Sequence, residues 1–470
     1  MSSNRRYLSH LLEPIALDEE NLRTVLSAFQ AAILSAIKQI EDHTSRSASD
    51  KHDSLYTGDS GVSLLFLRLV LQSNAAGLPD DVKNSLQALI RTHLPPLAEY
   101  QPVPGYLSPL ETPVGPALVE VFTDLVYPPG SAAVWKTSLT TVKNSIRVAS
   151  HDFHTGGDEV LYGRAGMLWG MLNLVRWADR NSKEPDQVRR LELASIVDAH
   201  TLSKVIGRII DIGKAGSTAF IRKEGSEESL PLMWEWHGKY YLGAIHGVAG
   251  ILTVLLQAPH TLIAPHLPII ISTVSALVLL AERNNGHLPS SLPARNKNPL
   301  VQICHGSPGL LILLATIRTR HPTHCSDNWD NAEQMACRVV WQEGLLRKGL
   351  GVCHGASGNA WSLLLFAHAR RGTTIGDKAL ARALAFLLQA MHMPPLTLIK
   401  PVNQSPYCTP DHPYSLFEGI AGVVCAWADA CVVIQDRLTR IGGGKPEKRE
   451  LREPVLGIPG LGGMGAGGVL

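Results

Sequence analysis

Pairs of glycines, each followed by a mostly apolar run, recur along the whole chain. Six clear copies of the pattern Gly-x-x-Gly have their glycines at Gly58 and Gly61, Gly163 and Gly166, Gly247 and Gly250, Gly306 and Gly309, Gly355 and Gly358, and Gly419 and Gly422. A seventh, degenerate copy, Thr112-Pro-Val-Gly115, keeps the second glycine and leads into the apolar run 117–127. Successive copies then lie 49 to 84 residues apart, which is room for two helices and two connections in each unit.

The composition of the runs predicts helices. Residues 62–72 and 251–257 are rich in leucine, alanine and valine and are apolar on nearly every face, which is typical of buried helices. Strands would instead require alternating valine and threonine with hairpin signals. Between the runs, residues 21–41 and 377–391 place apolar side chains at spacings of three and four, with charges on the other face, and these segments predict outer helices.

Seven units without an obvious capping repeat favour closure into a ring over an open solenoid. We therefore predict an all-α fold, an α/α toroid with seven inner and seven outer helices. The paired glycines permit close backbone approach at the start of each inner helix. Because amides at helix N-termini would point at the axis, the centre of the ring is where we expect the chemistry.

We predict one main domain. An N-terminal segment with an outer helix (1–50) precedes the toroid (51–435), and a Gly-rich, disordered tail (436–470) follows it. The stretch nearest to a membrane span is 262–280, but two prolines and His266 interrupt it, and we predict a buried core helix.

Charge and cysteine usage exclude several classes of protein. A net charge of +2 without a basic patch argues against a nucleic-acid partner. Seven unclustered cysteines do not indicate a disulfide scaffold, and the first residues lack the apolar core of a secretory signal. These features predict a reducing, cytoplasmic location. Membrane association is not indicated, since the pair Arg5-Arg6 is too short to argue lipid binding.

Two consecutive repeats carry the tripeptide Cys-His-Gly, at Cys304-His305 and at Cys353-His354. A catalytic zinc ion usually has three protein ligands and one open position. The two cysteines and one of the two histidines would form such a set, leaving the other histidine as an acid/base or supporting group. The alternative is that the pairs arose by duplication and that the cysteines are small buried residues without a metal.

Other repeats place polar residues at the position of these histidines, directly before the first glycine. His246 and Glu418 hold that position, so we expect their side chains to face the same axis as His305 and His354. His246 is a candidate acid/base catalyst, and Asp158 is a candidate to orient it. The alternative for either residue is a purely structural hydrogen bond.

Positive charges are expected at the same rim. Arg164 and Lys348 would suit the carboxylates of a substrate. The alternative interpretation is that both residues are ordinary surface charges in contact with solvent.

The ordered motifs resemble one family over roughly residues 50–435. They are Tyr-Thr-Gly-Asp-Ser-Gly (56–61), Asp-Glu-Val-Leu-Tyr-Gly-Arg-Ala-Gly (158–166), Gly-Ala-Ile-His-Gly-Val-Ala-Gly (243–250), Cys-His-Gly-Ser-Pro-Gly (304–309), Gly-Val-Cys-His-Gly-Ala-Ser-Gly-Asn (351–359) and Ser-Leu-Phe-Glu-Gly-Ile-Ala-Gly (415–422). This succession resembles the eukaryotic lanthionine synthetase C-like proteins. The resemblance implies an α/α toroid and a zinc ion held by Cys304, Cys353 and His354, with His305 unligated.

The resemblance also implies a reaction. Bacterial relatives add a peptide cysteine thiol to dehydroalanine or dehydrobutyrine, and the eukaryotic members bind glutathione and are thought to add its thiol to dehydroamino acids in proteins. His246 and Asp158 match the proton-transfer and orienting residues, with His305 as the second choice for the proton, and Lys348 matches a lysine implicated in glutathione contact. We therefore predict a zinc-dependent enzyme that adds glutathione or a peptide thiol to dehydroamino acids.

The chain departs from the family pattern at two places, and two other functions stay open. Thr112 replaces a repeat glycine. Cys408 stands where an arginine is expected, so we expect part of the glutathione-binding contact to differ from that of the family. A scaffold that binds zinc and glutathione without turnover would need the same ligands. A carbohydrate-active enzyme on the same fold would need two opposed carboxylates, for which Asp158 and Glu418 are the candidates.

Overall fold

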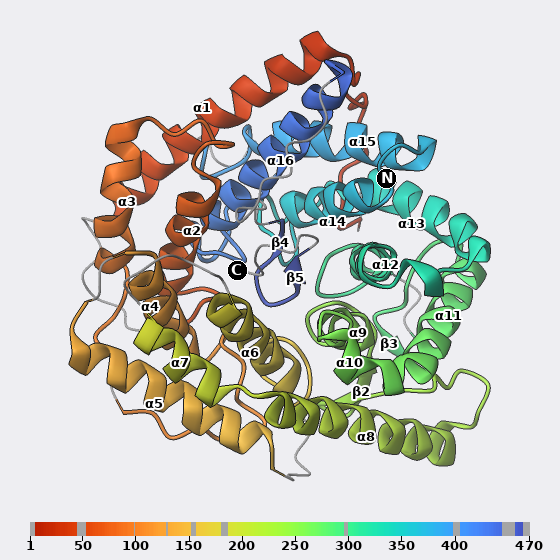
Figure 1. Ribbon diagram of the computed structural model, residues 1–470. Helices are drawn as coiled ribbons and strands as arrows, with labels where there is room; N and C mark the ends of the chain where they lie inside the picture. The colour runs from red at the N-terminus through yellow and green to blue at the C-terminus, as the bar shows by residue number, and fades with distance from the viewer. Residues whose placement is uncertain are drawn as a thin grey trace.

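The computed structural model describes residues 5–44, 53–97, 99–127, 130–151, 157–179, 187–295, 299–397, 405–443 and 456–463. Within this part of the chain, helices form two concentric rings (Figure 1). The inner ring consists of α2 (Asp59–Gln72), α4 (Val114–Val126), α6 (Arg164–Asp179), α9 (Val248–Leu255), α12 (Ser307–Arg320), α14 (Ala356–Ala369) and α16 (Ile420–Ile441). The outer ring consists of α1 (Glu19–Thr44), α3 (Asp80–Thr92), α5 (Ala132–Ala149), α8 (Ala199–Glu224), α11 (Leu267–Arg283), α13 (Asp330–Glu343) and α15 (Thr374–Ala390). The predicted all-α toroid with seven inner and seven outer helices is confirmed.

Short elements complete the connections. They are α7 (Gln187–Ile196), α10 (His260–Ile263), the 3₁₀ turns η1 (Ala264–His266), η2 (Pro322–His324) and η3 (Asp327–Trp329), the antiparallel strands β1 (Glu235–Trp236), β2 (Lys239–Tyr241) and β3 (Ser291–Leu292), and the hairpin β4 (Gly457–Ile458) and β5 (Gly462–Gly463).

The two rings differ in burial as their sequences predict. All eight residues of the inner helix α9 are buried, whereas in the outer helix α3 only Leu86 and Ile90 are. Helices that are apolar all round need neighbours on every side, and the outer helices cover the flank that the inner ring leaves open.

The second glycine of each repeat places the inner helix tightly against the loop before it. In six of the seven copies a Cβ atom at this glycine would collide with the carbonyl oxygen of the residue six positions earlier, namely at Gly61, Gly115, Gly166, Gly250, Gly358 and Gly422. At Gly309 it would meet the backbone of Ala244 instead. Gly115 belongs to the degenerate copy, so the loss of glycine at Thr112 leaves the decisive close contact intact. The helix that follows, α4, occupies its regular place in the inner ring.

The ring closes where α16 packs against both α1 and α2. Arg68 of α2 and Asp429 of α16, both fully buried, form an ion pair of 3.0 Å across this contact. Asp429 also accepts hydrogen bonds from Gln72 Nε2 (2.7 Å) and from Trp361 Nε1 of α14 (2.8 Å). The carboxylate thus joins three inner helices.

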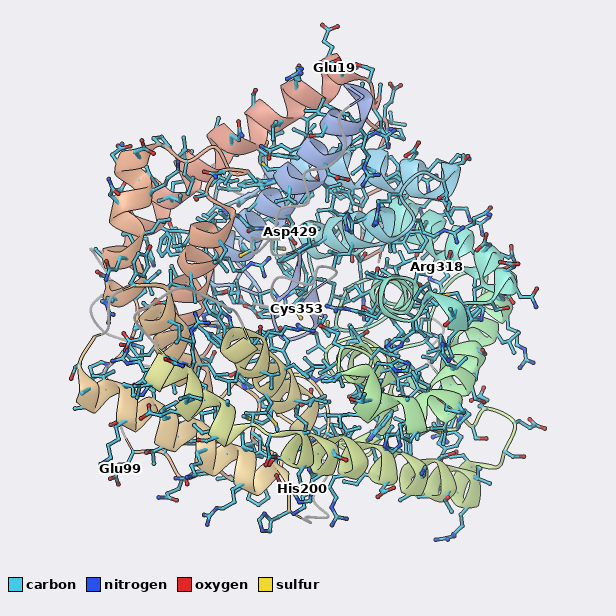
Figure 2. The ribbon with its side chains drawn as sticks, in the orientation of Figure 1. Glu19, Glu99, His200, Arg318, Cys353 and Asp429 are labelled. Carbon is cyan, nitrogen blue, oxygen red and sulfur yellow. The ribbon has the colours of Figure 1, made fainter. Side chains whose placement is uncertain are left out.

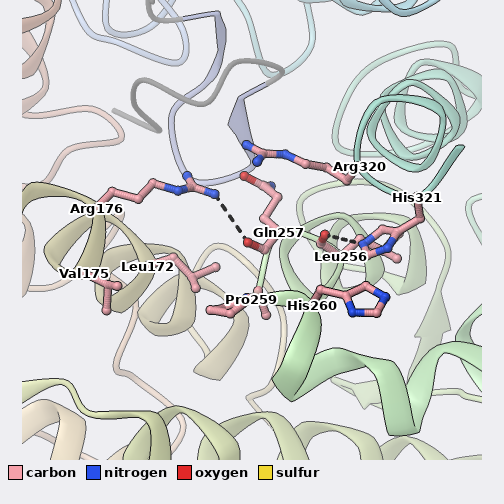
Figure 3. A pocket seen from close by; sticks show the side chains of 10 residues that line it. Leu172, Val175, Arg176, Leu256, Gln257, Pro259, His260, Arg320 and His321 are labelled. Carbon is pink, nitrogen blue, oxygen red and sulfur yellow. Dashed lines mark hydrogen bonds between the residues drawn. The ribbon is translucent and has the colours of Figure 1, made fainter. Parts of the chain in front are cut away.

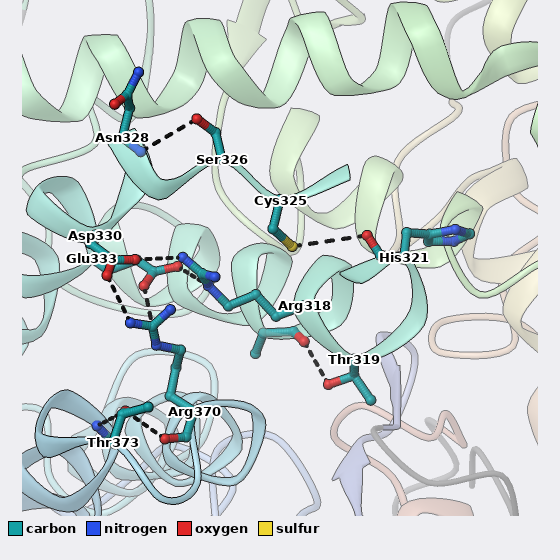
Figure 4. Close-up of polar contacts among 12 residues, drawn as sticks. Arg318, Thr319, His321, Cys325, Ser326, Asn328, Asp330, Glu333, Arg370 and Thr373 are labelled. Carbon is teal, nitrogen blue, oxygen red and sulfur yellow. Dashed lines mark hydrogen bonds and ion pairs between the residues drawn. The ribbon is translucent and has the colours of Figure 1, made fainter. Parts of the chain in front are cut away.

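A second ion-pair network ties the rings together at α13 (Figure 4). Arg318 of α12 donates to the buried Glu333 (2.6 Å) and to Asp330 (2.8 Å). Arg370, at the end of α14, donates to the other oxygen of Asp330 (3.0 Å). One outer helix therefore fixes the C-terminal ends of two inner ones.

The predicted disordered tail is wrong for two segments. Helix α16 continues to Ile441, beyond the expected boundary at residue 435, and residues 456–463 form a buried hairpin at the centre of the ring (Figure 1). Gly457 N donates to Asp429 Oδ2 (2.9 Å), and Gly463 N donates to Gln257 Oε1 (3.2 Å). Polar groups of the inner helices thus order a segment that composition alone marked as disordered. Residues 444–455 and 464–470 lie outside the described part.

The apolar stretch 262–280 belongs to the outer ring, so the prediction of a buried core helix is wrong. Residues His260–Arg283 are long and apolar enough to cross a membrane by length and composition, and 39% of the most apolar window is buried in the ring. Helix α11 buries one face against α12 and α13, while Leu279 on the other face is 52% exposed.

Replacing Asp429 should destabilise the closed ring. Asp429→Ala leaves Arg68 buried without its carboxylate, so we expect the free energy of unfolding to fall by about 3–5 kcal/mol in urea denaturation. Asp436→Ala is the matched control, because its pair with Arg440 on the same helix is partly exposed and its loss should cost less than about 1 kcal/mol. Equal losses in the two variants would contradict this account of ring closure.

Candidate metal and thiol site

The two Cys-His-Gly repeats meet at the N-terminal ends of α12 and α14. The ligand atoms of Cys304, Cys353 and His354 all lie within 4.8 Å of one another. The backbone of Cys304 donates to the carbonyl of Cys353 (3.3 Å), which holds the two loops together. Figure 2 shows Cys353 near the middle of the ring. The fold therefore gathers two thiols and one imidazole, the donor types that zinc prefers.

The two buried thiols, Cys304 and Cys353, have pKa values that are shifted in opposite directions. A hydrogen bond from Cys353 lowers the pKa of Cys304 despite its burial, and Gln302, whose Nε2 lies 3.0 Å from Cys304 Sγ, lowers it further. The hydrogen bond to Cys304, together with burial, raises the pKa of Cys353 well above its usual value. Two thiolates side by side in a buried site repel each other. A divalent cation would relieve this conflict, so the donor set fits a zinc ion.

His246 lies beside this cluster and is oriented by Glu159. The Nδ1 atom of His246 is 3.2 Å from Glu159 Oε2. Burial disfavours the charged ring, but the hydrogen bond and negative charge of Glu159, together with Cys353, raise the pKa of His246. Glu159 is itself held by the backbone amides of Leu161 and Tyr162. His246 therefore has a fixed orientation and a raised pKa, the two properties that an acid/base group would need.

The orienting role predicted for Asp158 is wrong, because its side chain points elsewhere. Asp158 forms a buried ion pair of 2.7 Å with Arg164. Arg164 is fully buried and also donates to the carbonyls of Ala149 (3.1 Å) and His151 (3.0 Å). The role predicted for Arg164 in substrate binding is wrong for the same reason. The pair instead fixes the start of α6.

His305 stacks on His246, with ring centroids 5.7 Å apart, and its ring lies tilted against that of Tyr241, with centroids 5.3 Å apart. Burial, the neighbouring His246 and Lys239 lower the pKa of His305 to about 4. His305 is therefore neutral at physiological pH, whereas His246 holds its proton more firmly. Two adjacent histidines with separated pKa values suit different roles in proton transfer.

Lys348 lies at the exposed rim of the site. Its charge adds to the lowering of the pKa of Cys304. The hydrogen bond with Cys353 raises the pKa of His354, and the charge of Lys348 opposes that rise. The N-terminal segment runs alongside the same loop, because Arg347 N donates to the carbonyl of Arg6 (3.0 Å) and Arg347 Nε to that of Arg5 (3.2 Å). The backbone of Arg5 and Arg6 thus lies beside Arg347, the residue before Lys348, and the side chains of both arginines are exposed.

Tyr56 was missed by the sequence analysis although its position in the repeat indicates it. It stands two residues before the first glycine of its copy, as Cys304 and Cys353 do in theirs. The ring is buried against Phe417, with centroids 4.6 Å apart, and burial and the nearby Cys353 raise the pKa of the phenol. Gln302 and Glu159 were missed as well, since neither holds a recurring position.

The carboxylates proposed for a carbohydrate-active enzyme are not an available pair. Glu418 is half-buried and its charge acts on His354, so it faces the site as expected. Asp158, however, is committed to Arg164. A carbohydrate-active enzyme would therefore lack one of the two carboxylates that its mechanism requires.

All seven cysteines are free thiols. Cys337, Cys425 and Cys431 are buried in helices, Cys325 is half-buried, and Cys408 is exposed. The backbone of Cys408 donates to the carbonyl of Arg347 (2.7 Å), so this residue borders the rim near Lys348.

Known proteins match this chain over the region that contains the site. The model of the family described as "Lanthionine synthetase C-like protein" matches residues 130–433. "LanC-like protein GCL1" of Arabidopsis thaliana is 31% identical over 271 residues, which are 58% of this chain and 54% of that protein. "Glutathione S-transferase LANCL1" of Danio rerio is 32% identical over 275 residues, which are 58% of each chain. The aligned segment thus covers little more than half of each relative.

Removing the charge of Glu159 should lower the pKa of His246. In Glu159→Gln the burial of the ring remains while the stabilising charge is lost, so an NMR titration of the His246 ring should show protonation at lower pH than in the wild type. Glu343→Gln, which alters the separate pair of Glu343 with His287 (3.3 Å), should leave the His246 titration unchanged. An unshifted His246 curve in Glu159→Gln would rule out Glu159 as its partner.

Proposed function

Because the chain belongs to the lanthionine synthetase C-like family, we propose that it is a zinc-dependent enzyme that adds a thiol, glutathione or a peptide cysteine, to dehydroamino acids. The observation that carries the proposal is the convergence of Cys304, Cys353 and His354 within 4.8 Å, beside an oriented histidine. The zebrafish relative, named as a glutathione S-transferase, supports a transferase.

Cys304, Cys353 and His354 would hold the zinc ion and leave one position for the substrate. Bound zinc would supply a Lewis acid that keeps an incoming thiol deprotonated near neutral pH. Gln302 donates to the sulfur of Cys304 and so fixes the orientation of that side chain. Tyr56 packs beside Cys353 and helps to exclude water from the buried side of the cluster.

The addition replaces one S–H bond and one carbon–carbon π bond by one C–S and one C–H bond. The thiol loses its proton, its sulfur bonds to the β-carbon of dehydroalanine or dehydrobutyrine, the double bond becomes single, and the α-carbon takes up a proton. Protonated His246, held by Glu159, is the donor that we assign, since the pKa of His305 is too low for that ring to be an imidazolium cation at neutral pH. Amides at the start of α12 and α14 would stabilise the negative charge that develops on the substrate.

Glutathione carries two carboxylates, which positive charges at the rim would bind. Lys348, together with Arg5 and Arg6 of the adjoining segment, supplies them. Cys408 adds no charge where the family pattern has an arginine, so the grip on one carboxylate would be weaker here. The seven free thiols support a reducing, cytoplasmic setting for this reaction.

Metal analysis tests the proposed site. We expect about one zinc per chain in purified wild-type protein and less than a tenth of that in Cys353→Ala after dialysis, because a ligand is lost. Cys337→Ala removes a buried thiol of α13 outside the cluster and should keep its zinc. A wild-type protein that binds no zinc when supplied with it would refute the metal site.

His246→Ala should separate catalysis from binding. General acid/base catalysis contributes about 10²- to 10⁴-fold, so we expect turnover of glutathione with a dehydroalanine peptide to fall at least about 100-fold. Zinc content and glutathione affinity should stay unchanged, and His200→Ala on the exposed outer helix α8 should retain full turnover. Unchanged turnover in His246→Ala would remove this residue from the mechanism. Binding without turnover in the wild type would favour the scaffold alternative.

A further inference from the structure

A pocket of about 330 Å³ opens at the C-terminal ends of α6, α9 and α12, away from the thiol site (Figure 3). The inner helices begin at the cysteine cluster, so this pocket lies at their opposite ends. Its apolar wall includes Leu172, Val175 and Pro259. Most of its polar side chains are those of arginine and histidine.

Two arginines and two histidines line the pocket, namely Arg176, Arg320, His260 and His321. No aspartate or glutamate is among its described lining residues. Figure 3 shows Arg176 and Arg320 reaching toward Gln257 from opposite sides. Burial and the charge of Arg320 lower the pKa of Arg176 to about 9. The pocket therefore brings two guanidinium groups together in partly dehydrated surroundings, which costs free energy without an anion.

Helix ends explain part of this arrangement but not all of it. Carbonyls at helix C-termini attract cations, and Arg176 Nη2 donates to the carbonyl of Gln257 (3.3 Å) while His321 Nε2 lies 2.9 Å from that of Leu256. The Nη1 atom of Arg176, however, is buried and has no hydrogen-bond partner within the described chain. One charged donor of the pocket thus still lacks an acceptor.

We propose that this pocket binds the phosphate group of a small phosphate monoester. Arg176 and Arg320 supply two positive charges for a dianion, which matches phosphate better than a single carboxylate. Each arginine also donates through Nη2 to a backbone carbonyl, Arg176 to that of Gln257 (3.3 Å) and Arg320 to that of Gly463 (3.2 Å). His260, exposed at the rim, donates a further hydrogen bond to the same group. The organic part of the ligand packs against Leu172 and Pro259. This binding function is independent of the thiol chemistry at the opposite end of the helices.

Isothermal titration calorimetry of the full-length protein tests the proposal with inorganic phosphate and glycerol phosphate, in chloride buffer of matched ionic strength. We expect saturable binding of both, tighter for glycerol phosphate because of its contact with the apolar wall. Arg176→Gln should weaken binding by about tenfold or more, since a charged hydrogen bond is lost. His260→Ala, at an exposed position that tolerates substitution, should weaken it roughly threefold or more.

The control is Arg283→Gln, which removes an exposed arginine from the end of α11 and should bind as the wild type does. All variants should keep their zinc content. No phosphate binding beyond that of chloride, or undiminished binding in both pocket variants, would overturn the site. Equal affinity for the two probes would overturn the assignment to a monoester.

Discussion

Closure of the inner ring is the constraint on which the rest of the structure depends. Helices α1 and α2, from the beginning of the chain, pack against α16 near its end, and the buried pair of Arg68 and Asp429 crosses that contact. Closure forces every inner helix to begin around one axis. Cys304 and Cys353 can then meet although 49 residues separate them in the sequence. The same closure orders the hairpin 456–463, because Asp429 accepts from Gly457 at the centre.

The fold could be predicted from the sequence because its repeat is a steric requirement. In six of the seven copies a side chain at the second glycine would collide with the carbonyl oxygen six residues earlier, so this position marks the start of an inner helix. The degenerate copy was recognised for that reason, since Gly115 is the glycine that the packing needs. The repeat likewise predicted that the two Cys-His pairs meet, because equivalent positions of a closed repeat face the same axis. The choice of His354 over His305 came from the family resemblance, and the ligand atoms of Cys304, Cys353 and His354 do lie within 4.8 Å of one another.

The remaining errors concern contacts that no repeat encodes. Asp158 and Glu159 are adjacent carboxylates, and backbone direction alone decides that Glu159 reaches His246 while Asp158 turns to Arg164. Arg164 opens an inner helix as a rim residue would, yet the carbonyls of α5 and its connection draw it into the interior. The Gly-rich end of the chain has no hydrophobic periodicity to read. Its order comes from Asp429 and Gln257, side chains far away in the sequence.

The common direction of the inner helices explains why the two ends of the ring carry different chemistry. Helix N-termini stabilise negative charge, and there the chain places Cys304 and Cys353, directly before α12 and α14. Helix C-termini stabilise positive charge, and there it places Arg176, Arg320 and His321. At the first end the thiolates would recruit a metal cation. At the other end the carbonyls hold the basic groups in place but leave Nη1 of Arg176 without an acceptor among the described residues, and there we propose that an anion binds. A closed ring of parallel inner helices would therefore provide a cation site at one end and an anion site at the other, both from one arrangement of the backbone.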